Sequence, residues 1–123
     1  MRDEKTFSLS GTAPVGSTAV IGEVVSSCYR HRTVAFEVTA GAQALDAFEV
    51  QVQMCGEGAW VTLINSFAAV GAILLFKSGD LAALAAGTAG QGLILLNGVF
   101  AIRFRASAAT ADSAVTIKGG LSE

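Results

Sequence analysis

Three segments of this 123-residue chain alternate apolar and polar side chains with a period of two. They cover residues 33–39 (TVAFEVT), 48–54 (FEVQVQM) and 100–105 (FAIRFR). Successive side chains of a pleated strand point to opposite faces, so each segment would have one buried face and one solvent-facing face. This period constrains the fold more than any other feature of the chain. It predicts amphipathic β-strands that pair in antiparallel sheets.

Turn signals at close intervals divide most of the remaining sequence into further short strands. We predict strands at Lys5–Ser10, Thr18–Ser26, Arg32–Ala40, Leu45–Met54, Ala59–Ile64, Gly92–Leu96, Val99–Ser107 and Ala114–Lys118. Asp80 before a run of Ala and Leu, with Gly87 after it, predicts at most one short helix. The pattern therefore predicts a single all-β domain over residues 1–123, an antiparallel β-sandwich or jelly roll.

The alternation also assigns faces to the strands. The inward residues would be Val34, Phe36, Val38, Phe48, Val50, Val52, Met54, Phe100, Ile102, Phe104, Val115 and Ile117. The outward residues would be Glu37, Glu49, Gln51, Gln53, Arg103, Arg105, Thr116 and Lys118. Cross-strand pairs between these acids and arginines would each contribute a few tenths of a kcal/mol.

The chain is unusually apolar for its size. Hydrophobic residues make up 52% and charged residues 15% of the sequence, against about 25% charged in an ordinary domain. The surplus apolar surface must enter a membrane or subunit contacts. The segment Phe67–Phe76 is too apolar to face water and too long for one ordinary strand. It predicts an interface formed by Phe67, Val70, Ile73, Leu74, Leu75 and Phe76.

A membrane hairpin is the first alternative. Residues 59–76 and 81–102 are uncharged over about a membrane-spanning length, as in a small holin. Against this, Asn65 and Ser66 interrupt the first stretch, and the glycine-rich segment Gly87–Gly92 interrupts the second as a loop would. Amphipathic strands would also leave unpaired edges in lipid. Buried strands and loops at a subunit interface fit both stretches better.

The inventory of reactive side chains is small. His31 is the one histidine, and no nucleophile or orienting partner can be assigned to it, so we expect a solvated or hydrogen-bonded surface residue. Neighbouring cations could lower the pKa of the Cys28 thiol, but a small buried strand residue is the simpler interpretation. Cys28 and Cys55 lack metal-binding spacing and are expected to be reduced, buried thiols. We predict no catalytic, cofactor-binding or metal-binding residues, and no enzyme activity.

Other binding functions can be weighed in the same way. The net charge of -2 and the absence of a basic run argue against nucleic-acid binding. Trp60 is the second alternative, because an exposed Trp on a sandwich could stack on a sugar ring and make this a carbohydrate-binding module. Packing in the core or at an interface is the simpler expectation for it. The charged start MRDEK lacks the apolar core of a secretory signal, which favours synthesis in a cytoplasm.

The cadence of the strands from Asp46 to Gly120 resembles a known group of proteins. The carrying segments are DAFEVQVQ from Asp46, GAWVTL from Gly58, GVFAIRFRAS from Gly98 and SAVTIKG from Ser113. They are similar to small virion proteins of tailed bacteriophages, among them head decoration or cementing proteins. The apolar segment from Phe67 to Phe76 departs from that pattern.

This resemblance implies a β-sandwich without enzymatic activity that forms dimers or trimers and clamps neighbouring capsid subunits. Its partners would be the major capsid protein or other virion proteins, and its location would be the virion after synthesis in the host cytoplasm. A protein of this kind needs contact area rather than a reaction centre, which agrees with the apolar composition of the chain.

Overall fold

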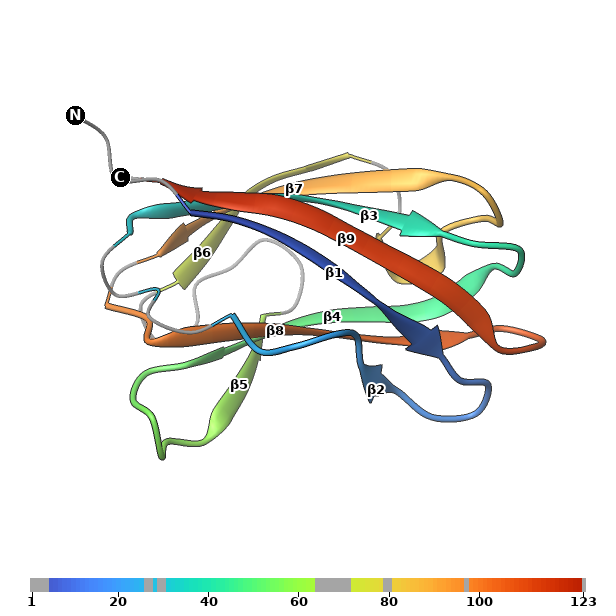
Figure 1. Ribbon diagram of the computed structural model, residues 1–123, viewed down its shortest axis with the longest axis horizontal. Coiled ribbons are helices and arrows are strands. Elements are labelled where there is room, and N and C mark those ends of the chain that lie inside the picture. Colours follow the sequence, from blue (N-terminus) through green and yellow to red (C-terminus); the bar gives the residue numbers. More distant parts are fainter. Residues whose placement is uncertain are drawn as a thin grey trace.

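Two antiparallel sheets pack face to face in the computed structural model, which describes residues 5–25, 28, 31–63, 72–78, 81–96 and 98–122 (Figure 1). The strands are β1 (Lys5–Ala13), β2 (Ala19–Val20), β3 (Thr33–Ala40), β4 (Leu45–Gln53), β5 (Trp60–Leu63), β6 (Ala72–Ser78), β7 (Ala89–Leu96), β8 (Ala101–Ala108) and β9 (Ser113–Ser122). One 3₁₀ turn, η2 (Leu81–Ala83), lies between β6 and β7. The predicted all-β sandwich is confirmed.

The strand order has the features of a jelly roll. One sheet has the order β1-β9-β3-β7-β6 and the other β2-β8-β4-β5. The first and last strands of the chain are hydrogen-bonded neighbours, and most connections cross from one sheet to the other. Strand β6 forms an additional edge beside β7, joined to it through a register shift between Leu74 and Phe76. The fold is therefore an eight-stranded jelly roll extended by one edge strand.

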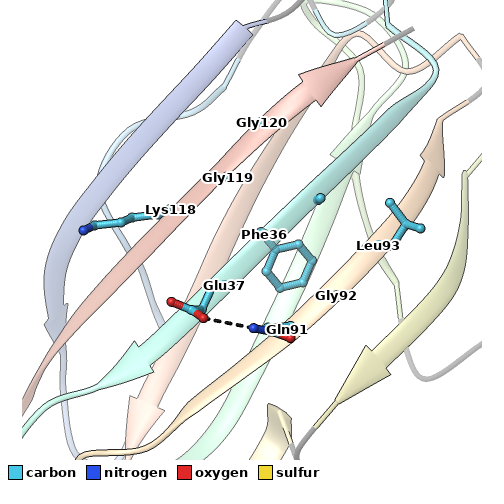
Figure 2. Close-up of a pocket in the computed structure, with 9 residues that line it drawn as sticks. Phe36, Glu37, Gln91, Gly92, Leu93, Lys118, Gly119 and Gly120 are labelled. Carbon is cyan, nitrogen blue, oxygen red and sulfur yellow. Dashed lines mark hydrogen bonds between the residues drawn. The ribbon is translucent and has the colours of Figure 1, made fainter.

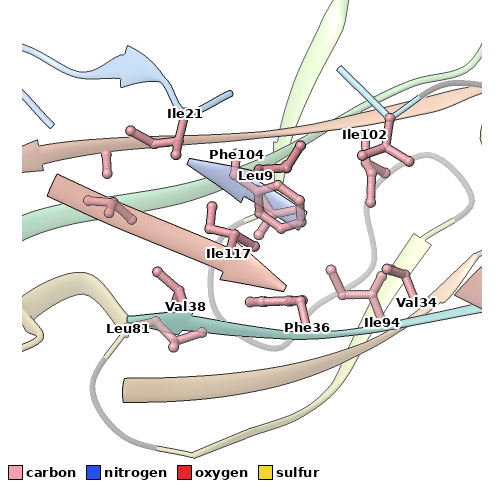
Figure 3. Close-up of a cluster of buried hydrophobic side chains, with 14 of the residues drawn as sticks. Leu9, Ile21, Val34, Phe36, Val38, Leu81, Ile94, Ile102, Phe104 and Ile117 are labelled. Carbon is pink, nitrogen blue, oxygen red and sulfur yellow. The ribbon is translucent and has the colours of Figure 1, made fainter. Parts of the chain in front are cut away.

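Phe104 of β8 is at the centre of the core between the sheets (Figure 3). Its fully buried ring has centroid distances of 5.2 Å to Phe36, 6.0 Å to Phe7 and 6.0 Å to Phe48. These rings come from β3, β1 and β4, so one side chain joins both sheets. Aliphatic side chains from facing strands fill the space around it. They include Leu9, Ile21, Val34, Val38, Ile94, Ile102 and Ile117.

Glycines on the strands next to β3 and β1 make room for two of these rings. Phe36 lies between Gly92 of β7 and Gly119 of β9 in the register of the sheet. A Cβ at Gly92 would lie 2.5 Å from the Phe36 ring, and one at Gly119 would lie 2.6 Å from the Phe7 ring. Both distances are too short for real atoms. The absence of a side chain at these positions therefore lets aromatic rings pack directly on the strand backbone.

These contacts explain why some predicted strand limits were wrong. Glycines were read as the ends of strands, whereas β7 begins at Ala89 and β9 continues to Ser122 through Gly119 and Gly120. Consequently the segment Gly87–Gly92 is only in part a loop. Strand β6 was missed because its sequence, AILLFKS, does not alternate.

The segment predicted as one strand at Thr18–Ser26 is irregular. Only Ala19–Val20 is a regular strand, although the backbone N–H groups of Ile21 and Val25 still donate to β8. Gly22 interrupts the strand with φ of +69°, a conformation that strands do not use.

Most inward assignments are confirmed, but two residues differ. Met54 is 40% exposed because it lies beyond the last residue of β4, and Phe100 is half-buried just before β8. Phe48 is also half-buried, but its ring packs against Phe104 in the core, as predicted. In the opposite direction, Gln51 and Gln53 were predicted to face water and are buried.

Replacing Phe104 with Ala should lower the free energy of unfolding by about 3–5 kcal/mol, because it removes the ring that contacts three others and leaves a cavity. Phe104→Leu should cost about 1–2 kcal/mol. Urea unfolding measures both. Ser8→Ala, on the exposed face of β1, is the control and should change stability by no more than about 0.5 kcal/mol. Equal costs for the two Phe104 variants would contradict a central role for the ring.

Gly119 and Gly120 offer a matched pair of substitutions. Gly119→Ala places a methyl group against the carbonyl oxygen of Ala35 and the Phe7 ring, and should destabilise the protein by about 1–3 kcal/mol. At Gly120 the nearest atom, the carbonyl oxygen of Lys5, would be an ordinary 3.7 Å away. Gly120→Ala should therefore be neutral or slightly stabilising. Thermal unfolding compares the two, and a similar loss for both would show that the rings do not depend on Gly119.

Candidate interaction surfaces

The outer face of the four-stranded sheet carries a connected polar network. Gln51 of β4 donates from Nε2 to Thr62 Oγ1 of β5 at 3.0 Å, and its Oε1 accepts from Arg103 Nε of β8 at 2.6 Å. Gln53 donates from Nε2 to the carbonyl oxygen of Gly58 at 2.7 Å. Both outward glutamines are buried, and each amide is hydrogen-bonded to neighbouring groups, as buried polar groups require.

Trp60 completes this network at the start of β5. The guanidinium carbon of Arg103 lies 4.3 Å from the centroid of the Trp60 ring, in cation–π geometry. The half-buried ring therefore packs against a neighbouring side chain on the outer face of the sheet, whereas the simpler sequence interpretation placed it in the core or at an interface. One of its faces is taken by Arg103, which leaves less of the ring for stacking on a sugar.

Arg105 and Glu49 form the acid–arginine pair expected between these strands. They are register partners on β8 and β4, and Arg105 Nη1 lies 3.5 Å from Glu49 Oε1. Arg105 Nη2 also donates to Oγ1 of Thr18 at 2.6 Å and to its carbonyl oxygen at 3.3 Å. Both side chains are partly exposed, so the ion pair contributes at most about 1 kcal/mol.

A shallow hollow of about 460 Å³ lies on the outer face of the five-stranded sheet (Figure 2). Its floor is a row of cross-strand neighbours with small or apolar side chains, Leu93, Ala35 and Gly120. The next row is polar, and in it Gln91 Nε2 donates to Glu37 Oε2 at 3.0 Å. The hollow exists because the floor lacks bulky side chains where the inner face carries aromatic rings.

Strand β6 contains four of the six residues predicted to form an interface. Ile73, Leu74, Leu75 and Phe76 lie on this edge strand of the five-stranded sheet. Phe67 and Val70 lie outside the described residues. No strand was predicted in this apolar segment, whereas its second part is a regular strand paired with β7.

Three exposed valines lie along the segment that leads from β1 past β2. Val15, Val20 and Val24 are 48%, 38% and 43% exposed. Val15 also donates its backbone N–H to Asp112 Oδ1 at 3.0 Å, across the turn before β9. Sequence reasoning assigned no function to these valines, because single valines in a predicted strand carry no distinctive signal.

The positions of His31 and Cys55 correct two sequence predictions. His31 was expected at the surface but is buried, and its Nδ1 has no hydrogen-bond partner among the residues that the structure describes. Its backbone N–H donates to the carbonyl oxygen of Cys28 at 2.9 Å. Cys55 was expected to be buried but is exposed in the turn between β4 and β5.

Cys28 is a buried free thiol, as the simpler interpretation predicted. Its Sγ donates to the carbonyl oxygen of Val25 at 3.2 Å. Burial raises the pKa of this thiol to about 11, because the thiolate would lose its hydration, and the charge of Lys5 offsets only part of the effect. The alternative that Cys28 is a reactive thiol with a lowered pKa is therefore wrong.

Within the described ranges, no group of three or more His, Cys, Asp or Glu side chains is arranged to hold a metal ion. The same residues include no helix long and apolar enough to cross a membrane. The two stretches that suggested a membrane hairpin instead contain strands β5, β6 and β7. The holin-like helical hairpin is therefore wrong for the described parts of both stretches.

Comparison with known proteins identifies the fold. No family model and no curated protein sequence matches the chain. Among solved structures, the SPBc2 prophage-derived protein YomS superposes with a TM-score of 0.61 at 16% identity, over 100% of this chain and 96% of YomS. A chain from the disulfide-linked pili of Bacillus endospore appendages gives a TM-score of 0.45 at 11% identity, over 98% of this chain and 87% of that chain. The likeness to YomS shows a shared fold along the whole chain.

The two cysteines should differ in reactivity with Ellman's reagent. At pH 8 we expect one thiol per native chain to react, that of Cys55, because Cys28 is buried and remains protonated below its raised pKa of about 11. Both should react in denaturant. Cys55→Ser should abolish the native reaction and Cys28→Ser should preserve it. Rapid reaction of two thiols in the folded protein would show that Cys28 is accessible.

Proposed function

We propose that this chain is a non-enzymatic structural protein of a phage particle. It associates with copies of itself as a dimer or trimer, and it decorates or cements the shell through contacts with the major capsid protein or another virion protein. The observation that carries the proposal is the edge strand β6, whose sequence and position suit a strand that pairs with another chain.

Strand β6 differs from the other three edges of the sandwich. An edge strand exposes unpaired backbone groups, and proteins protect such edges by making them short or polar. Strand β2 has two residues and β5 has four. Strand β1 is longer, but its outer face is polar, with exposed Thr6, Ser8, Ser10 and Thr12.

In contrast, β6 has seven residues that begin with an uncharged apolar run. No strand in the described part of the chain pairs with its outer edge. A second copy or a shell subunit that continued the sheet would form backbone hydrogen bonds along this edge.

Two further observations support a role in a particle. The prophage-derived YomS has the same fold over the whole chain, and the strand cadence from Asp46 to Gly120 resembles small virion proteins. The low charged fraction of 15% also suits a protein that spends its working life in contact with other subunits. Such a protein requires neither a cofactor nor a reaction centre.

Light scattering of the purified chain after gel filtration tests the self-association. We expect the mass of a dimer or trimer, and Leu74→Asp or Leu75→Asp should reduce it to that of a monomer, because a charge buried in an apolar interface costs several kcal/mol. The two variants are made separately, with circular dichroism as the measure of folding. Binding of the wild-type chain to isolated phage shells, measured by co-sedimentation, tests the second part of the proposal.

Val20→Asp is the matched control, since it places the same charge on the edge strand of the other sheet. It should leave the mass unchanged. If Val20→Asp dissociated the oligomer and the β6 variants did not, the interface would lie at the edge of the four-stranded sheet. The proposal as a whole would be overturned if the wild-type chain were a monomer and did not co-sediment with phage shells.

A further inference from the structure

Two contacts fix the orientation of the Arg103 guanidinium group. Its carbon lies 4.3 Å from the centroid of the Trp60 ring, and its Nε–H donates to Gln51 Oε1 at 2.6 Å. Gln51 is in turn buried and bonded to Thr62. The group is therefore fixed by side chains from the two strands β4 and β5 before any partner arrives, which reduces the entropy that binding would cost.

The remaining donors of Arg103 have no acceptor in the described part of the chain. Within the residues that the structure describes, the guanidinium group donates only its Nε–H, so both terminal nitrogens keep their hydrogens for another acceptor. Arg105 provides the contrast on the same strand face, since one of its terminal nitrogens contacts Glu49 and the other donates to Thr18. The terminal nitrogens of Arg103 are thus oriented donors without an acceptor among the described residues.

The charges of the ionised side chains around Arg103 do not balance. Arg103 and Arg105 carry two positive charges and Glu49 carries one negative charge, which leaves one positive charge among these three groups. Burial lowers the pKa of Arg103, and the neighbouring charge of Arg105 lowers it further. An anion placed at Arg103 would offset the repulsion between the two arginines.

We propose that Arg103, supported by Trp60 and Gln51, is a docking site for the carboxylate of an Asp or Glu side chain from a partner protein. The planar, forked guanidinium group matches a carboxylate through two parallel hydrogen bonds. An acidic side chain fits better than a sugar, because Arg103 already occupies one face of the Trp60 ring. The site lies on the outer face of the four-stranded sheet and would act whether or not the protein belongs to a phage particle.

The test uses the full chain and the peptide acetyl-Gly-Glu-Gly-Glu-Gly-amide, with the corresponding Gln peptide as a control. Trp60 is the only tryptophan, so its fluorescence reports on the site. We expect saturable binding of the Glu peptide with a dissociation constant of about 1–10 mM, weakened by salt. The Gln peptide should bind at least about tenfold more weakly.

Matched variants of the two arginines identify the donor. Arg103→Gln and Arg103→Lys should each weaken binding of the Glu peptide at least about fivefold by calorimetry, since Lys keeps the charge but not the fork. Arg105→Lys, the same change two residues along the strand, should leave the affinity within about twofold, because the terminal nitrogens of Arg105 are already engaged.

Three results would overturn the proposal: no saturation by the Glu peptide, equal weakening by Arg103→Lys and Arg105→Lys, or tighter binding of glucuronate or inorganic phosphate than of the Glu peptide. The last would assign the arginine to a sugar acid or a phosphate instead. Because the titration involves no shell and no self-association, its failure would leave the β6 proposal in place, and the reverse also holds.

Discussion

Direct packing of aromatic rings on glycine backbones is the constraint on which this sandwich depends. Phe36 lies between Gly92 and Gly119, and Phe7 lies on Gly119. A Cβ at either glycine position would clash with a ring, so only glycine lets the two rings lie this close to the backbone of the sheet. At that depth both rings contact Phe104 from the opposite sheet. A larger residue at either glycine would move a ring away from the backbone and separate the sheets.

The same packing shapes the outside of the molecule. Where the inner face of the five-stranded sheet has rings, its outer face has Ala35 and Gly120, so the sheet is hollowed there. The other sheet has the opposite arrangement, because its outer face carries long side chains that lie on one another, from Trp60 to Arg105. The two broad faces therefore differ in kind: one presents backbone and small groups, and the other presents an organised layer of planar polar groups.

Strict alternation made much of this fold predictable from the sequence. Strands β3, β4 and β8 were placed within a few residues, and the pairing of Glu49 with Arg105 follows from their outward positions on neighbouring strands. The failures have two physical causes. Glycine normally ends strands, and the sequence does not show that a ring from an adjacent strand will cover it, so the extents of β7 and β9 were underestimated.

The second cause is that burial of a polar group depends on neighbours that are distant in sequence. Gln51 becomes buried because Arg103 and Thr62 cover it, and neither contact can be read from the local pattern. The interface residues on β6 were proposed from their apolarity alone, and their place at a sheet edge became clear only from the topology. For the same reason the arrangement of Trp60 under Arg103 could not be predicted.

The topology also relates the two proposed surfaces to each other. Strand β6 ends the five-stranded sheet, β5 ends the four-stranded sheet, and the two strands are in contact, so both edges lie on the same side of the sandwich. A chain that extended the sheet beyond β6 would therefore lie beside the strand that begins with Trp60. Backbone pairing at β6 would supply contact area with little selectivity, because any extended chain can offer the same hydrogen bonds. A carboxylate site at Arg103 would add the selectivity that an edge strand lacks, since a partner without a correctly placed acid would leave the oriented guanidinium group without its acceptor.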